Sequence, residues 1–133
     1  MNLRLAWHPQ NLTARNPIII EELLAFEAAG KQDGVAMHIK MLKDLFEYGR
    51  ASRYVVKMKS LPIWELKSAS RGGEKGGARI YLFMIGSGES EPDAGIVNCE
   101  IKEADEPDAA KLETVLEVLD AFQRGVRVFR GAE

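Results

Sequence analysis

One short apolar run constrains the fold more than any other feature of this 133-residue sequence. Residues 80–85 read IYLFMI and carry no charge. The run is too short for a typical buried helix, whereas a strand covered on both faces is often this short and this apolar. Polar, glycine-containing stretches at 68–77 and 86–95 bound it on each side. The pattern predicts a central strand in an antiparallel meander.

Shorter strands are expected around this run. The segment 62–67 alternates, which places Trp64 and Leu66 on the opposite face from Glu65 and Lys67. Three further segments are predicted to be extended: 2–7, 54–59 and 96–101. Of these, 54–59 has the weakest pattern.

Two helices are predicted before the meander. Asn16 is expected to cap a first helix that opens with Pro17 and stops at Gly30. Asp33 is expected to cap a second helix that ends near Gly49. Because only about three residues join these helices, they should form an antiparallel hairpin that packs on one face of the sheet.

Apolar stripes support the second helix and a last one. The stripe of the second helix follows +4, +3, +4 spacing: Val35, Ile39, Leu42 and Phe46. The last helix starts near Pro107, ends at Gly125 and has a longer stripe: Leu112, Val115, Leu116, Leu119 and Phe122. The predicted fold class is therefore α+β, with the order β-αα-ββββ-α in one domain that spans 1–133.

Several classes of protein do not fit this sequence. No stretch approaches the length of a membrane-spanning apolar helix, and the first residues lack the features of an export leader, so a cytoplasmic protein is expected. Cys99 is the only cysteine and has apolar neighbours, which favours a buried core residue over a nucleophile. His8 and His38 have no ligand partners at metal-site spacing, so we expect no metal and no cofactor, and His38 is expected to be a packed or surface residue.

Charge is unevenly distributed along the chain, although the net charge is only −2. The segment 50–79 has eight basic and two acidic residues, a net charge of +6. The segment 87–120 has two basic and eleven acidic residues, a net charge of −9. The first segment suits a polyanion and the second a basic partner, and two solvated surfaces of opposite sign remain the simpler alternative.

A pair of cations is predicted at one end of the meander. Lys67 ends one strand and Arg79 begins its hairpin neighbour, so the two should lie close together. Like charges this close need an anion between them, either Glu65 or a bound phosphate. The alternative is a surface ion cluster of little energetic consequence. The glycine-rich segment 71–77 joins two strands and lacks the GxxxxGK[ST] pattern, so a hairpin loop is expected there rather than a nucleotide cradle.

Three short motifs carry a resemblance to a known family. They are the segment 61–67 (LPIWELK), the apolar strand opened by Arg79, and Ile101-Lys102 followed by Pro107 and a helix. Together with the element order over 33–124, they resemble the RelE/ParE/HigB toxin superfamily, closest to its phage-derived HigB-like branch.

The resemblance implies the toxin of a type II toxin–antitoxin system, a ribosome-dependent mRNA endoribonuclease that needs no metal. By position, it implies that Lys67, Arg79 and Lys102 bind and activate the phosphate. Further basic residues would attract RNA non-specifically: Lys57, Lys59, Arg71 and Lys75.

The implied partners are mRNA, the ribosome and a cognate antitoxin, expected to be a helix-turn-helix protein. The antitoxin would cover the basic sheet surface or displace the C-terminal helix. No Tyr or His follows Lys102, where nucleases of the family usually have a proton-transfer residue. A non-catalytic RelE/ParE-like interaction protein, or a gyrase-directed inhibitor, is therefore the alternative.

Overall fold

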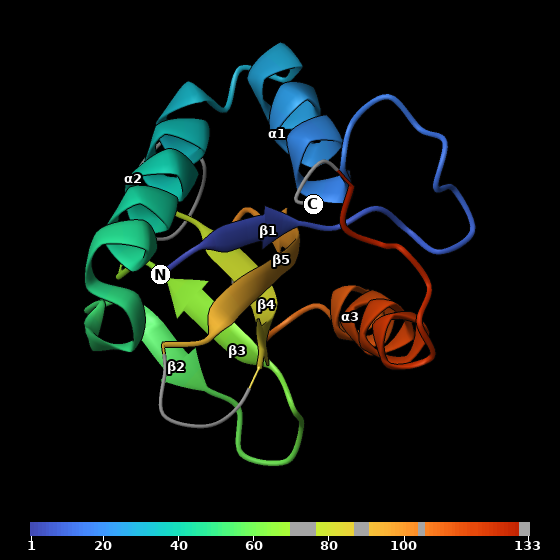
Figure 1. The fold of residues 1–133 in the computed structure, drawn as a ribbon. Helices are drawn as coiled ribbons and strands as arrows, with labels where there is room; N and C mark the ends of the chain where they lie inside the picture. Colours follow the sequence, from blue (N-terminus) through green and yellow to red (C-terminus); the bar gives the residue numbers. More distant parts are fainter. Residues whose placement is uncertain (70–76, 87–90, 104–105, 131–133) are drawn as a thin grey trace.

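The computed structural model describes residues 1–69, 77–86, 91–103 and 106–130, which form an α+β fold (Figure 1). Within these ranges the elements are β1 (Leu3–Leu5), α1 (Ile18–Ala28), α2 (Gln32–Tyr48), the 3-10 turn η1 (Gly49–Ala51), β2 (Val55–Lys57), β3 (Trp64–Lys67), β4 (Arg79–Ile85), β5 (Asp93–Glu100) and α3 (Ala109–Gln123). The strand order in the sheet is β1-β5-β4-β3-β2. β1 runs parallel to β5, and the other neighbours are antiparallel.

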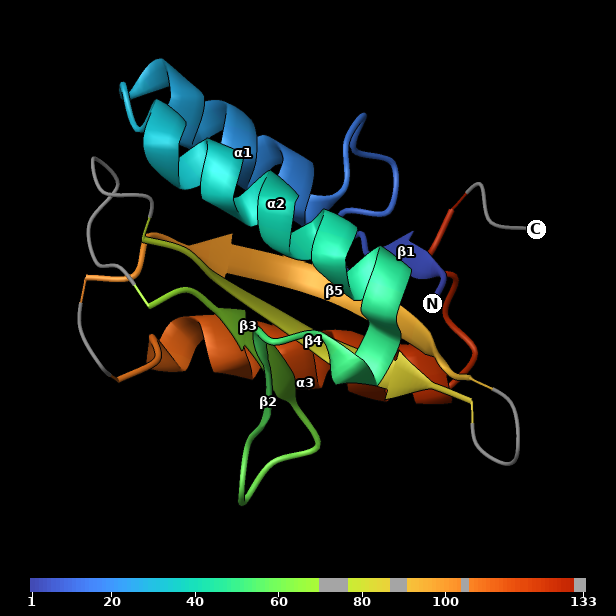
Figure 2. The same cartoon turned by 90° about the vertical axis from the view of Figure 1, so that its left-hand side faces the viewer.

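Helices cover both faces of the sheet. Figure 2 shows α1 and α2 on one face and α3 on the other. On β4, Ile80 and Leu82 pack into the core beneath α1 and α2, whereas Tyr81 and Phe83 pack into the core beneath α3. All four side chains are buried, and β4 is the middle strand. The predictions of a central apolar strand and a helical hairpin on one face are confirmed.

The predicted helix caps are wrong in detail. Pro17, rather than Asn16, is the residue before α1, and the Asn16 amide donates to the Glu21 carboxylate at 2.9 Å. No side-chain hydrogen bond caps the start of α1. Lys31 precedes α2, and Asp33 lies inside its first turn without making a capping bond. Gly30, with φ of 80°, separates the two helices as expected.

The apolar stripe predicted on α2 is not its most buried row. Ile39 and Phe46 are 43% and 59% exposed, while Val35 and Leu42 only border the core. The fully covered row is one position earlier along the helix: Gly34, His38, Met41 and Leu45. Two of the four residues in this row are a glycine and a histidine, so the spacing of apolar residues does not reveal it.

The last helix starts at Ala109, two residues after Pro107, and its predicted stripe is confirmed only in part. Val115 is buried, whereas the other four members border the core: Leu112, Leu116, Leu119 and Phe122. The Asp108 side chain caps α3 by accepting from the Ala110 amide at 2.9 Å. The chain then returns beside the start of the sheet, where the Trp7 amide donates to the Val128 carbonyl at 2.7 Å. In the part of the chain that the structure describes, no helix has the length and apolar character needed to cross a membrane.

Candidate functional site

The predicted cation pair lies where β3 and β4 meet the loop that joins them. Lys67 is the last residue of β3 and Arg79 the first of β4, and the two are direct partners in the antiparallel register. Trp64 and Leu66 pack toward the helical hairpin, so the alternate residues Glu65 and Lys67 lie on the α3 side of the sheet. The predicted juxtaposition of Lys67 and Arg79 is confirmed.

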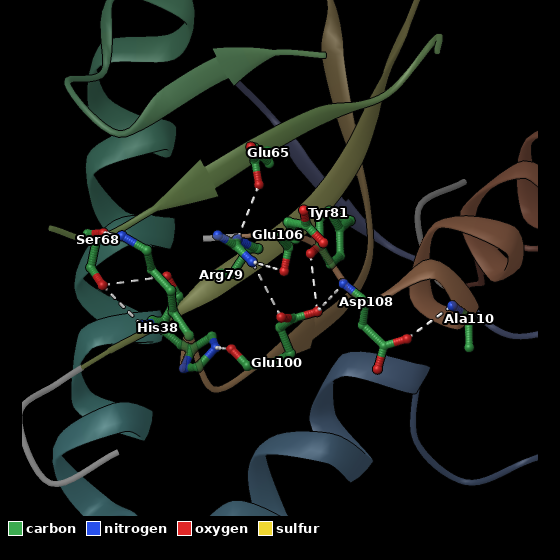
Figure 3. Close-up of polar contacts among 11 residues, drawn as sticks. His38, Glu65, Ser68, Arg79, Tyr81, Glu100, Glu106, Asp108 and Ala110 are labelled. Carbon is green, nitrogen blue, oxygen red and sulfur yellow. Dashed lines mark hydrogen bonds and ion pairs between the residues drawn. The ribbon is translucent and has the colours of Figure 1, made fainter. Parts of the chain in front are cut away.

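Arg79 is buried and surrounded by acceptors. Its side chain is only 1% exposed. Its Nε lies 3.3 Å from a carboxylate oxygen of Glu65, and a terminal nitrogen lies 3.4 Å from a carboxylate oxygen of Glu100 (Figure 3). The same terminal nitrogen donates to the Glu106 carbonyl at 2.9 Å. A buried guanidinium needs such partners, because removing a charge from water is costly unless it is compensated.

Glu100 links this arginine to the beginning of α3. Its second carboxylate oxygen accepts from the Tyr81 hydroxyl at 3.0 Å and from the Asp108 amide at 3.1 Å. Burial, and then the negative charge of Glu100, raise the pKa of Tyr81 far above its usual range. Tyr81 is therefore a neutral hydrogen-bond donor at ordinary pH and does not act as a base. Figure 3 shows the resulting chain of contacts from Glu65 through Arg79 and Glu100 to Asp108.

We call Glu65, Arg79, Tyr81 and Glu100 the arginine corner. One guanidinium lies beside two carboxyl side chains here, so Arg79 has acidic partners before any ligand binds. A phosphate that approaches Arg79 therefore competes with these carboxylates and with the Glu106 carbonyl. The ion pairs and hydrogen bonds of the arginine corner connect β3, β4 and β5 to the segment before α3.

Lys102 lies beside this corner. It is 7% exposed, and its Nζ donates to the Ser68 carbonyl at 2.6 Å. Ser68 directly follows Lys67, and its hydroxyl accepts from the Ala78 amide at 2.9 Å. The structure therefore brings Lys67, Arg79 and Lys102 to one end of the β3–β4 hairpin, with Lys67 the exposed member of the three.

The described residues that were predicted to attract RNA non-specifically do not lie there. Lys57 is paired with Trp64 at the opposite end of β3, and its Nζ donates to the Met58 and Leu61 carbonyls at 2.8 and 2.6 Å. Lys59 is exposed in the same β2–β3 connection. Arg71 and Lys75, with most of the glycine-rich segment, lie outside the described residues. The two described members of this predicted group, Lys57 and Lys59, therefore lie at the opposite end of β3 from Lys67.

Glu100 and Tyr81 were not predicted as members of this site. The structure makes Arg79 and Glu100 direct partners across β4 and β5. The strand of Glu100 starts at Asp93, three residues before the predicted start, and a register irregularity near Tyr81 and Leu82 interrupts its pairing with β4. Alternation along a regular strand from residue 96 could not reveal this partnership.

His38 is packed, which was one of its two expected locations. Its Nδ1 lies 2.6 Å from the Gly34 carbonyl and its Nε2 lies 3.0 Å from the Glu100 carbonyl. Burial lowers the pKa of His38 below its ordinary value, so the ring is neutral in the folded protein near pH 7. Cys99 is buried as predicted, and burial raises the pKa of its thiol, which makes it unreactive.

Neither the described side chains nor the comparisons point to a cofactor or a family. Within the described ranges, no three histidine, cysteine, aspartate or glutamate side chains gather as they would around a metal ion. No protein-family model matches the chain, and no curated protein matches it.

Proposed function

We propose that this protein is a RelE/HigB-like toxin of a type II toxin–antitoxin pair, which cleaves mRNA on the ribosome. The observation that carries the proposal is the gathering of Lys67, Arg79 and Lys102 at one end of the β3–β4 hairpin. A helical hairpin before an antiparallel meander, with a last helix on the opposite face, adds support because the same order underlies the resemblance.

The exposed Lys67 is the first contact for RNA in this proposal. Its ammonium group attracts a backbone phosphate, and Lys102 lies close enough to the same hairpin end to add a second positive charge. Arg79 reaches the phosphate only after it leaves the Glu106 carbonyl and a carboxylate. It otherwise holds the hairpin end in place.

Induced expression in a bacterial host tests this function, with growth arrest as the first readout and mapping of mRNA 5′ ends by primer extension as the second. Lys67→Ala should lower cleavage by about a hundredfold, the usual effect of removing one charged donor from a reacting phosphate. Lys40→Ala is the matched control, because Lys40 is exposed on α2, on the other face of the sheet. Equal cleavage by both variants would contradict the proposed role of Lys67.

A second candidate is a non-catalytic interaction protein or gyrase-directed inhibitor. The burial of Arg79 between two carboxylates favours it, because this arginine is already neutralised. Growth arrest with intact mRNA would support this candidate, and an assay of DNA supercoiling by gyrase would then separate its two forms.

A further inference from the structure

A second arginine lies in surroundings unlike those of Arg79. Arg4 is in the middle of β1, the strand at the edge of the sheet (Figure 1). Its guanidinium carbon lies 4.8 Å from the centre of the Phe129 ring. Its Nε is buried and has no hydrogen-bond partner in the described part of the chain. Because the Arg4 side chain is partly exposed and its charge has no carboxylate partner among the described residues, it can meet an anion from solvent.

The backbone beside Arg4 is also open to pairing. The Asn2 carbonyl accepts from the Ala94 amide and the Ala6 amide donates to the Ile96 carbonyl, so even-numbered residues of this strand pair with β5. In a parallel ladder the residues between them direct their N–H and C=O groups to the other side. Among the described residues, nothing hydrogen-bonds to the outward groups of Leu3 and Leu5.

Hollows line this open edge. One, of about 330 Å³, is bordered by side chains on both sides of the strand, including Leu3, Leu5 and Ile20 toward α1 and Phe129 toward α3. Another, of about 460 Å³, lies where Phe46 of α2 approaches the beginning of β1. Because Phe46 is exposed and borders this hollow, an apolar side chain of a partner could pack against it.

We propose that the edge of β1 binds an extended segment of a partner protein as an additional strand. The segment alternates apolar and acidic residues. Its backbone pairs with the outward groups of Leu3 and Leu5, as in other cases of strand addition. Its apolar side chains lie on the α1–α2 side with these leucines, and its carboxylates lie on the α3 side, where they meet Arg4. Arg130, stacked 4.1 Å from the centre of the Trp7 ring, adds positive charge near the end of this edge.

A second copy of this chain fits the edge poorly. The antiparallel register that uses every outward group of both strands pairs Leu3 with Leu5 of the second copy. It places the two Arg4 residues directly opposite each other, where like charges destabilise a sheet. Two strands separate the β1 edge from β3, so binding at this edge does not depend on the proposed toxin function.

The test uses the whole protein labelled with ¹⁵N and an acetylated, amidated heptapeptide of alternating valine and glutamate. Addition of peptide should shift the amide signals of β1 and slow hydrogen exchange at Leu3 and Leu5 by at least about tenfold. A peptide N-methylated at the amides that would face β1 keeps its side chains and should not bind. A peptide with lysine in place of glutamate should bind about tenfold more weakly or not at all.

Protein variants separate the charge from the edge itself. Arg4→Glu should weaken binding of the glutamate peptide by about tenfold or more, Arg4→Gln by less, and Lys40→Glu on α2 should leave binding unchanged. The signals outside β1 report whether each variant is folded. Equal binding of the N-methylated peptide, equal binding of the lysine peptide, or no binding of the glutamate peptide would overturn the proposal. A dimer in solution with Leu3 and Leu5 protected without peptide would overturn it in favour of a second copy.

Discussion

The two arginines on the α3 side of the sheet, Arg79 and Arg4, differ in burial and in their acidic partners. Arg79 is almost completely covered, and two carboxylates and a carbonyl surround it. Arg4 is partly exposed, stacks on one aromatic ring and makes no ion pair among the described residues. Arg79, which belongs to a family motif, is therefore already paired with carboxylates of the protein. Arg4, which belongs to no motif, remains available to a ligand.

The largest effect is expected from Arg79→Ala. Removal of this guanidinium leaves Glu65 and Glu100 near each other without their shared cation, which should reduce the free energy of unfolding by about 3–5 kcal/mol. Arg4→Ala should cost about 1 kcal/mol or less, since it removes one ring contact. Urea unfolding of both variants provides the measurement. Equal losses for the two arginines would break the contrast between them.

A somewhat smaller effect is expected from Gly95→Ala on β5. A Cβ at this position would lie 2.8 Å from a ring carbon of Phe129 and 3.2 Å from ring carbons of Phe83. Because the core must shift to admit it, the substitution should cost about 1–3 kcal/mol. Phe129→Leu in the same chain should recover part of that loss by making room. If Gly95→Ala melts like the wild type, Phe129 does not pack against β5 as described.

The pH dependence of stability should reveal His38. Its pKa is lowered by burial in the folded protein, whereas in the unfolded chain it stays near 6.5. The unfolded state therefore binds more protons as the pH falls through about 6.5, so stability is present above this pH and is lost below it. The slope is at most about 1.4 kcal/mol per pH unit.

His38→Gln isolates this contribution, because other groups titrate in both proteins. The variant should lose less stability than the wild type between pH 7 and 5.5, measured by urea unfolding at each pH. Glu22, whose pKa burial raises, acts with the opposite sign, and the comparison of the two proteins removes its contribution. Parallel curves for the two proteins would show that His38 is not buried in a neutral form.

The smallest effect is expected from an exposed ion pair. Arg124 lies 3.0 Å from Asp120 one turn earlier on α3, and both side chains are about two-thirds exposed. Arg124→Ala should change the free energy of unfolding by less than about 0.5 kcal/mol, because water and salt screen such a pair. Urea unfolding at low and high salt checks this. A loss comparable to that of Arg79→Ala would mean that burial is not what distinguishes the arginine corner.

The parts of the fold that sequence predicts best are those with local signals. The apolar run of β4, the stop at Gly30 and the opposition of Lys67 and Arg79 each depend on neighbours in sequence or on one hairpin. The misassigned row on α2 shows the limit of such signals. His38 belongs to the buried row and contacts the carbonyl of Glu100, which is 62 residues away in the sequence.

The same limit applies to the candidate site. The three predicted cations do gather at one hairpin end, but their availability depends on Glu100 and Glu106, which come from other parts of the chain. Spacing alone could not indicate that Arg79 is buried. The open groups of β1 were equally hidden, because an edge strand and a central strand can share the same residue types. Only the strand order shows which backbone groups lack a neighbour.

Site-resolved hydrogen exchange on the free protein tests this contrast most directly. The amides of Leu3 and Leu5 in β1 should exchange fast, while those of Arg4 and of Ala6, just after the strand, should exchange slowly, because only the latter two point toward β5. At the other site, the Nε proton of Arg79 should exchange slowly, as expected for a covered group beside Glu65. Uniform protection along β1, or rapid exchange of the Arg79 proton, would contradict the view that one site is open and the other is closed.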